Sequence, residues 1–361
     1  MMLLLFFLGL AALVAGAQVL VRGASKLALS LGISPLVVGL TVVAFGTSAP
    51  ELAVSLRSSF AGQVDIALGN VVGSNIFNVL FILGVSALIT PLVVAPQLIR
   101  QEVPIMVGAS LLLLALALDG RIGRLDGALL FGLLLAYTVF LVRQSRRESR
   151  ATQEGYGEEL GAKVTSDWDR HCSVQLLLIV SGLALLVVGA GWLVDAAVSF
   201  ARILGLSEMV IGLTIVAIGT SLPEVATSLV ATLRGERDIA VGNVIGSNTF
   251  NLLGVLGLSG LLAPAGLPVS AAVIVFDLPV MIAVALACLP IFFSGHLIAR
   301  WEGALFLAYY VAYAAYLLLA AQQHAATAVY GSVMLGFALP LTAVTLSVVA
   351  WREWRARQGS P

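Results

Sequence analysis

Charged residues are scarce in this chain. Of its 361 residues only 11% are Asp, Glu, Lys or Arg, and 60% are hydrophobic, whereas soluble domains carry about 25% charged residues. A chain this apolar cannot cover a globular surface with polar groups, so the sequence predicts a protein embedded in a lipid bilayer. The formal net charge is zero, and without a positive excess we expect no nucleic-acid partner.

Cysteine and histidine are also rare. Cys172 and Cys288 are far apart and form no metal-spaced set, so we interpret both as small apolar residues. His171, His296 and His324 are scattered near expected loops. We therefore expect no zinc or copper site and no cofactor, and we do not expect the chain to be an enzyme.

Long apolar runs fill most of the remaining sequence. A run of about 20 apolar residues is long enough to cross the hydrocarbon layer as a helix. The expected spans are 2–21, 36–60 (interrupted), 66–89, 98–118, 124–142, 174–194, 209–233 (interrupted), 239–262, 270–293 and 301–320, with an eleventh at 330–351. The first run imitates a signal peptide. No basic residue precedes it, and residues 16–34 match 189–207, so we expect it to be retained.

The chain contains an internal duplication. Residues 38–88 and 211–261 share 30 identities in 51 positions without a gap. Each unit has five expected spans, an odd number, so the second unit must enter the membrane from the opposite side; inverted repeats of this kind build many secondary transporters. The expected organisation is a first five-helix repeat (1–142), a cytoplasmic linker (143–173), a second, inverted repeat (174–320), an extra transmembrane helix (328–351) and a cytoplasmic tail (352–361).

The basic residues predict the orientation. With the N-terminus outside, fifteen Lys and Arg residues fall on the inner side and four on the outer side. Cytoplasmic loops carry the excess of positive residues in membrane proteins. We therefore expect an external N-terminus, with the linker and the C-terminus in the cytoplasm.

Two copies of one motif interrupt the second and seventh spans. GTSAPE occupies 46–51 and GTSLPE occupies 219–224. Pro50 and Pro223 lack a backbone donor and clash with the carbonyl four residues earlier. We expect each break to free carbonyl oxygens, around 44–46 and 217–219. In hydrocarbon such carbonyls are tolerated only where they line a cavity or bind something.

Glu51 and Glu224 are the only carboxylates deep in these spans, and no Lys or Arg lies beside them in the sequence. Each costs roughly 2.5–3.5 kcal/mol at the bilayer centre, so we expect a proton or a mobile cation as partner. Ca²⁺ takes six to eight oxygens, and Na⁺ accepts similar ligands. Oxygen-bearing side chains recur at four-residue spacing around them: Thr47, Ser55, Thr220, Ser228, Asn70, Ser74, Asn78, Asn243, Ser247 and Asn251.

Other interpretations stay open at this point. Polar faces can serve only as contacts between helices, and oxygen-lined constrictions also occur in cation channels. A hydrolase within the membrane would need a base beside Ser48 or Ser221, and the sequence places no His or Lys there. Glu102 and Asp277 lie near the beginnings of spans and are expected to be interfacial or capping residues.

The motifs GTSAPE, GNVVGSNIFN, GTSLPE and GNVIGSNTFN resemble the paired alpha repeats of the Ca²⁺/cation antiporter superfamily, in particular its prokaryotic sodium/calcium exchanger-like branch. The resemblance covers residues 1 to about 320. It implies an all-α, ten-helix inverted-repeat core that binds ions between the second, third, seventh and eighth helices. It also implies alternating access, in which the first and sixth helices slide across the core. The ligands it implies are Glu51, Glu224, Thr47, Ser48, Thr220, Ser221, Ser74, Asn78, Ser247 and the carbonyls of Ala44 and Ala217.

The chain departs from that pattern in two places. Asn251 stands where the well-described sodium/calcium exchangers have an aspartate, and we keep it in the predicted ligand set; a helix follows residue 330, outside the ten-helix pattern. The expected function is exchange of Ca²⁺ against Na⁺ across the inner membrane of a prokaryotic cell, with H⁺ or K⁺ as alternative coupling ions. Besides these ions and the lipid bilayer, no protein partner is implied.

Overall fold

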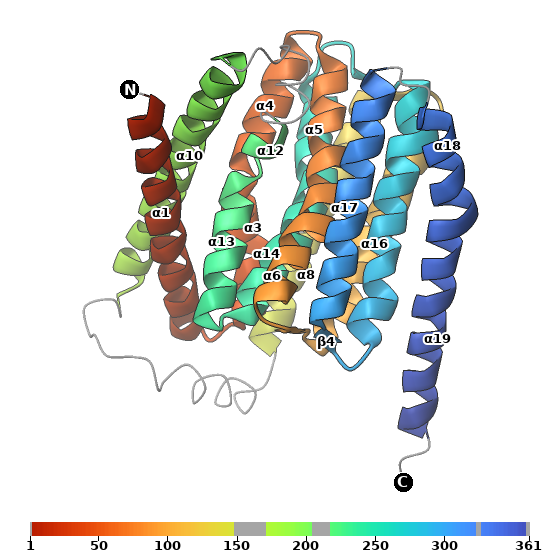
Figure 1. The fold of residues 1–361 in the computed structure, drawn as a ribbon. Coiled ribbons are helices and arrows are strands. Elements are labelled where there is room, and N and C mark those ends of the chain that lie inside the picture. Colours follow the sequence, from red (N-terminus) through yellow and green to blue (C-terminus); the bar gives the residue numbers. More distant parts are fainter. Residues whose placement is uncertain (1, 148–170, 204–216, 323–325, 359–361) are drawn as a thin grey trace.

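The computed structural model describes residues 2–147, 171–203, 217–322 and 326–358, and nearly all of them are helical (Figure 1). The α-helices are α1 (Met2–Leu31), α2 (Pro35–Val38), α3 (Ala44–Thr47), α4 (Ala49–Phe60), α5 (Val64–Phe77), α6 (Gly84–Ile89), α7 (Val103–Ala117), α8 (Arg124–Arg147), α10 (Cys172–Ile203), α12 (Ala217–Gly219), α13 (Leu222–Arg234), α14 (Arg237–Phe250), α15 (Leu256–Leu262), α16 (Leu278–Phe293), α17 (Arg300–Ala321), α18 (Ala326–Val333) and α19 (Leu339–Gln358).

Short π-helical segments continue several of these helices. They are η1 (Gly39–Val43), η2 (Asn78–Leu83), η3 (Leu98–Glu102), η6 (Asn251–Val255), η7 (Val273–Asp277) and η8 (Met334–Ala338). The strands are β1 (Leu92–Val93), β2 (Arg121–Ile122), β3 (Leu267–Pro268) and β4 (Leu297–Ile298). π-Helical turns are rare and often accompany functional sites, and here η2 and η6 begin at equivalent residues of the two repeats, Asn78 and Asn251.

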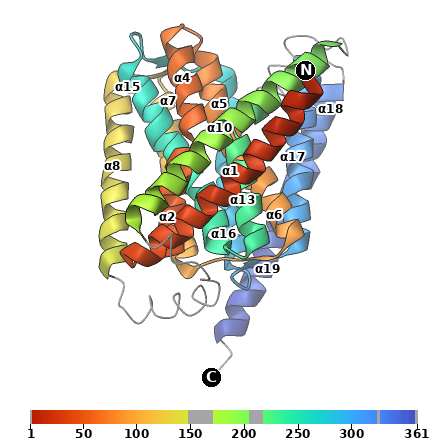
Figure 2. The same cartoon turned by 90° about the vertical axis from the view of Figure 1, so that its left-hand side faces the viewer.

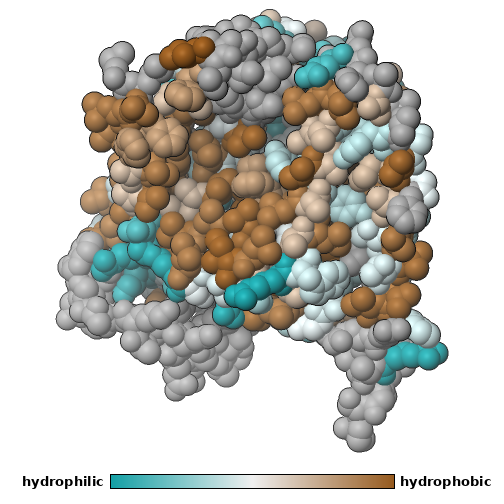
Figure 3. All heavy atoms as spheres, in the orientation of Figure 1, coloured by the Kyte–Doolittle hydropathy of each residue, from teal (hydrophilic) through white to brown (hydrophobic). Residues whose placement is uncertain are grey.

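The helices match the expected spans. Within the described residues, nine helices are long and apolar enough to cross a membrane, and a bent pair, 35–47 with 49–60, makes a tenth. The eleventh expected span is among the nine, as Tyr330–Val349. Of the expected span 209–233, residues 209–216 lie outside the described part of the chain. Large hydrophobic side chains such as Leu125, Val275 and Leu335 are exposed, and hydrophobic residues cover most of the middle of the face in Figure 3, as lipid contact requires.

The chain direction has the inverted arrangement that an odd number of spans predicts. The N-terminus lies at one end of the helices, whereas the ends of α8 and α19 and the start of α10 lie at the other (Figures 1 and 2). Two small antiparallel ribbons join the repeats: β1 pairs with β4, and β2 pairs with β3. Each ribbon therefore takes one strand from each repeat.

The helices α1 and α10 are longer than hydropathy predicts, 30 and 32 residues. At 1.5 Å per residue they exceed the roughly 30 Å hydrocarbon layer, so they must tilt. Figure 2 shows them side by side, running obliquely across one face of the other helices. Their backbones touch through glycines: a Cβ on Gly16 would lie 2.8 Å from the carbonyl oxygen of Gly182, and one on Gly9 would lie 2.9 Å from that of Gly189.

Glu102, expected to be an interfacial or capping residue, stands at the N-cap position of α7 without a side-chain capping bond, and its side chain is 0% exposed. Its Oε1 accepts hydrogen bonds from Gln97 (2.9 Å) and Gln101 (2.7 Å), and its Oε2 accepts one from Tyr137 of α8 (2.5 Å). Burial is possible because three donors together satisfy the carboxylate. The carboxylate ties the start of the fourth span to the fifth.

Replacing Tyr137 by Phe removes the donor to Glu102 Oε2 inside the protein. We expect a loss of about 1.5–3 kcal/mol in the free energy of unfolding, because hydrogen bonds to charged groups are worth that much. Unfolding in mixed detergent micelles measures it. The matched control is Tyr313→Phe, since Tyr313 donates to Asp277, the equivalent acid of the second repeat, over a longer 3.4 Å. A loss in Tyr313→Phe as large as in Tyr137→Phe would contradict this account.

Candidate functional site

Both GTSxPE motifs break their helices in the same way. The axis bends by 44° between the helices that flank Ser48, whose φ and ψ are −82° and 7°; Ser221 has −86° and 4°. Pro50 and Pro223 each occupy the first turn of the helix that follows, α4 and α13. A proline is tolerated there because the first turn's N–H groups have no helical acceptor. The break therefore starts a new helix in mid-membrane, with a glutamate in its first turn.

The expectation that the break frees the Ala44 carbonyl is wrong. That oxygen accepts the N–H of Ser48 at 3.0 Å, because the N–H that Pro50 lacks would have bonded to Gly46 and not to Ala44. The same oxygen also accepts the Thr47 hydroxyl at 3.4 Å, which uses the second lone pair of the carbonyl. In the second repeat the N–H of Ser221 donates to the carbonyl of Ile218 at 3.1 Å.

The glycines of the motifs permit close packing on α10. A Cβ on Gly46 would lie 2.5 Å from a side-chain carbon of Leu183, and one on Gly219 would lie 2.3 Å from a side-chain carbon of Val194. Both Leu183 and Val194 belong to α10. The broken helices can thus approach the oblique helix only because no side chain intervenes.

The two carboxylates are buried and are bonded across the repeats. Glu51 and Glu224 are both 0% exposed. Ser221 donates to Glu51 Oε1 at 2.9 Å, and Ser48 donates to Glu224 Oε1 at 3.0 Å. Each glutamate is therefore bonded by the serine of the opposite motif. No ion pair between described residues reaches either carboxylate.

Four acceptor atoms of the predicted ligand residues have no hydrogen-bond partner among the described residues. They are Oε2 of Glu51, Oε2 of Glu224, Oδ1 of Asn78 and Oδ1 of Asn251, and all are buried. A buried polar atom left unpaired is costly, so a set of four oxygens contributed equally by two repeats indicates a missing electropositive partner. Oxygens of this kind are the ligands that hard cations prefer.

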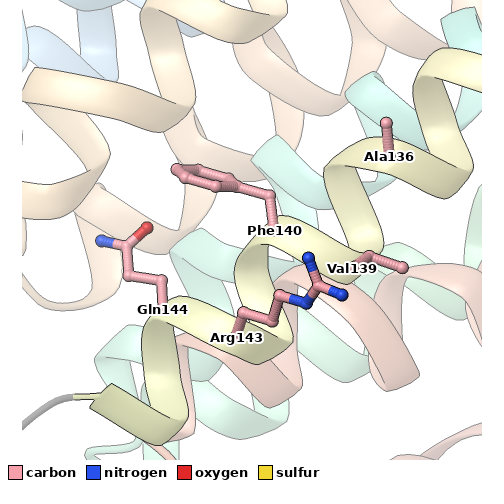
Figure 4. Close-up of a pocket in the computed structure, with 5 residues that line it drawn as sticks. All are labelled: Ala136, Val139, Phe140, Arg143 and Gln144. Carbon is pink, nitrogen blue, oxygen red and sulfur yellow. The ribbon is translucent and has the colours of Figure 1, made fainter.

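Hydroxyl and amide groups connect the rest of the predicted set. Thr47 donates to Asn243 at 3.1 Å, and Thr220 donates to Asn70 at 3.2 Å. Ser221 also contacts Ser74 (3.0 Å), and Thr47 contacts Ser247 (3.5 Å). The structure thus brings together the predicted side chains Glu51, Glu224, Thr47, Ser48, Thr220, Ser221, Ser74 and Ser247, and places Asn78 and Asn251 one helical turn after the last two. The hollow on α8 in Figure 4 involves none of them.

A family model decides the relationship of the chain to known proteins. The model described as sodium/calcium exchanger protein matches residues 1–143 and 174–319, which are almost all of both repeats. The chain belongs to the sodium/calcium exchanger family.

Curated and solved relatives of this exchanger cover most of the chain. The sodium/calcium exchanger MaX1 of Methanosarcina acetivorans is 36% identical over 339 residues, 86% of this chain and 96% of its own. The putative antiporter CaxA of Alkalimonas amylolytica is 40% identical over 267 residues, 73% of this chain and 82% of its own. The solved sodium-calcium exchanger NCX_Mj, soaked with Na⁺ and Ca²⁺, has a TM-score of 0.73 and 32% identity over 86% of this chain and 96% of that chain.

The exchanger site also depends on two residues that sequence reasoning missed, Asn75 and Asn248. Each donates to the other's backbone carbonyl, at 3.3 and 3.2 Å. Their side-chain oxygens accept from the amides across the axis: Asn251 donates to Asn75 at 3.1 Å, and Asn78 donates to Asn248 at 3.0 Å. These bonds use the NH₂ groups of Asn78 and Asn251 and leave their oxygens free. The sequence signal available for these two residues was the duplicated GSN triplet. They were missed because Asn75 lies off the helix face shared by residues 70, 74 and 78, and Asn248 lies off the equivalent face shared by residues 243, 247 and 251.

This crossed pairing predicts a specific pattern of energetic coupling. In double-mutant cycles with Ala, Asn75 and Asn251 should couple by about 0.5–1.5 kcal/mol in the free energy of unfolding, because they share a hydrogen bond. Asn78 and Asn248 should couple equally. The matched controls are the pairs within one repeat, Asn75 with Asn78 and Asn248 with Asn251, for which we expect little coupling. Stronger coupling within a repeat than between repeats would contradict the arrangement.

Proposed function

We propose that this membrane antiporter exchanges Ca²⁺ for Na⁺ by alternating access. Its ions would bind between the second span (α2 to α4), the third (α5 to α6), the seventh (α12 and α13) and the eighth (α14 to α15). The observation that carries the proposal is the set of four buried, unpartnered oxygens from Glu51, Glu224, Asn78 and Asn251. The names of the relatives MaX1 and NCX_Mj support the choice of ions.

The donor set suits these ions. Two carboxylate and two amide oxygens, completed by hydroxyls such as Ser74 and Ser247 and by water, can supply the six to eight oxygens that Ca²⁺ takes at flexible geometry. The described residues contain no group of three or more His, Cys, Asp or Glu that could hold a metal. A site with only two charged ligands binds a cation less tightly than a site made of carboxylates alone. A transported ion can therefore be released from it.

Competition for the two glutamates would couple the two ions. A site with two ionised carboxylates and no counter-ion is costly to enclose in hydrocarbon. A site filled by cations is neutral and can be enclosed. Exchange without leakage follows, because only the loaded protein passes readily through the closed intermediate.

The two repeats differ in exposure, which supports alternating access. Asn243 is 0% exposed, and Gly242 beside it is buried against α2, where a Cβ would lie 3.0 Å from the Leu36 carbonyl oxygen. In the first repeat the equivalent residue Asn70 is half-buried, and the equivalent residue Gly69 is exposed. Asn70 is the seventh residue of α5, a helix that starts at the end of the molecule that holds the N-terminus (Figure 1). An exchange of these two environments would move access from one side of the membrane to the other.

Removing either charge should abolish exchange. In proteoliposomes, Glu51→Gln and Glu224→Gln should each reduce Na⁺-driven ⁴⁵Ca²⁺ uptake at least about 100-fold, because a neutral amide cannot replace an ionic ligand whose loss costs several kcal/mol. The matched control is Glu302→Gln, a buried glutamate at the start of α17 that accepts only the N–H of Ala299. That variant should retain uptake, and normal uptake by either site variant refutes the assignment.

Measuring ⁴⁵Ca²⁺ uptake in the same vesicles under separately imposed Na⁺, K⁺ and H⁺ gradients identifies the coupling ion. We expect uptake with the Na⁺ gradient alone. Uptake driven by a pH gradient without sodium would replace Na⁺ by H⁺ in the proposal, and conductance without any counter-ion would identify a channel instead.

The orientation proposed is an external N-terminus with the linker and C-terminus in the cytoplasm of a prokaryotic cell. Cys172 tests it, because this residue is exposed at the start of α10 and the other cysteine, Cys288, is buried. A membrane-impermeant maleimide should label Cys172 in inside-out vesicles and not in intact spheroplasts. A Cys172→Ser variant controls for labelling at Cys288. Labelling in intact spheroplasts would reverse the orientation.

A further inference from the structure

The hydroxyl groups of the two GTSxPE motifs differ in where their protons go. The serines Ser221 and Ser48 donate to Oε1 of Glu51 and of Glu224, and Oε2 of each glutamate has no partner among the described residues. The threonine beside each serine donates elsewhere. A hydroxyl has one proton and two lone pairs, so the acceptor that takes the threonine proton also decides which other oxygens stay free.

Asn70 takes the proton of Thr220. Its Oδ1 accepts the Thr220 hydroxyl at 3.2 Å, and its Nδ2 donates to the backbone carbonyl of Glu51 at 3.2 Å and to Oγ of Ser55 at 3.0 Å. A backbone carbonyl can only accept, so the bond to Glu51 fixes which end of the amide faces Thr220. Both ends of this amide are therefore bonded inside the protein, unlike the amide of Asn78, whose oxygen is unpartnered.

The second repeat has the same arrangement. Asn243 accepts the hydroxyl of Thr47 at 3.1 Å and donates to Ser228 at 3.0 Å and to the carbonyl of Glu224 at 3.5 Å. Asn243 is 0% exposed. Because the same three bonds form in both repeats, they are a property of the two motifs and not of one side-chain orientation.

Each threonine has a second acceptor within reach. Thr220 also interacts with the side chain of Glu51, and Thr47 with that of Glu224. Without the asparagine oxygen, the hydroxyl would be free to turn to the carboxylate, and charged acceptors form the stronger hydrogen bonds. The carboxylate already accepts a serine proton on Oε1, so a second donor would occupy oxygen that a cation needs.

We infer that Asn70 and Asn243 are positioning residues of the ion site: each takes a threonine proton and thereby keeps the neighbouring glutamate oxygen bare for the cation. The inference rests on the proposed function. It also gives the threonines a defined role, because an oxygen whose proton points to the asparagine offers only lone pairs to the site. A hydroxyl binds a hard cation in that orientation.

Transport kinetics in proteoliposomes test the inference. Asn70→Leu keeps the approximate shape of the side chain and removes its polar atoms. It should raise KM for Ca²⁺ in Na⁺-driven ⁴⁵Ca²⁺ uptake about 5- to 10-fold, the factor that one hydrogen bond is worth, and change the maximal rate less. Asn243→Leu should behave in the same way, because it removes the same bonds in the second repeat.

A double-mutant cycle separates positioning from simple support of the helices. In Thr220→Val the hydroxyl is gone, so adding Asn70→Leu should raise KM less than about twofold further. In Thr220→Ser the hydroxyl stays, and Asn70→Leu should raise KM by its full factor. The matched control combines Asn70→Leu with Thr47→Val, whose hydroxyl bonds Asn243, and there the two factors should multiply.

The outcomes of the cycle separate the inference from the proposed function. An equal effect of Asn70→Leu with and without the Thr220 hydroxyl would mean that Asn70 only holds helices together, and it would overturn the inference while leaving the exchange in place. Absence of Na⁺-driven uptake by the unmodified protein would refute the proposed function itself. If Asn70→Leu does not fold, the cycle of Asn243→Leu with Thr47→Val decides by the same criterion.

Discussion

Two carboxylates held in the middle of a hydrocarbon layer, without a fixed positive partner in the described structure, are the constraint on which the rest of this protein depends. On insertion scales they cost about 5–7 kcal/mol together. The serines that bond one oxygen of each glutamate are neutral and leave the second oxygen bare. Each proline break starts a new helix, α4 or α13, and the glutamate lies in the first turn of that helix. The interlocked asparagines Asn75 and Asn248 accept from the amides of Asn251 and Asn78 and leave the side-chain oxygens of those two residues without a partner among the described residues.

The inverted duplication explains why so many contacts at the site come in pairs. Several bonds between the repeats are matched by the equivalent bond in the opposite sense, to within 0.1 Å: Ser48 with Glu224 and Ser221 with Glu51, or Thr47 with Asn243 and Thr220 with Asn70. Among the described residues, the contacts of Ser221 with Ser74 and of Thr47 with Ser247 lack such a counterpart. Because ligands come from both repeats, a movement of one repeat relative to the other changes the site as a whole. Asn70 is half-buried, whereas Asn243 is buried.

The sequence predicted the fold class, the spans of the described residues and the side chains that gather around Glu51 and Glu224, because hydropathy and a repeated motif are properties of the sequence itself. It could not predict what depends on contacts between distant segments. Hydropathy ended the first span near residue 21, whereas α1 continues to Leu31, because Arg22 and Lys26 interrupt the apolar run without ending the helix. Helical periodicity put Asn75 off the polar face, although that residue contacts the other repeat. The hydrogen bonds of Glu102 could not be predicted because its donor Tyr137 is 35 residues away in the sequence.

The reciprocal bonds of the site have a consequence for the origin of the protein. Contacts in which residue i of one half meets residue j of the other, and j meets i, are those of a two-fold homodimer. A single five-helix repeat, inserted in both orientations in the same membrane, would supply both carboxylates, both amide oxygens and both members of each crossed pair. Fusion of two such copies would add only the linker, which fixes the two repeats in opposite orientations in the membrane. An ancestral half-length gene could therefore have carried cations before it was ever duplicated.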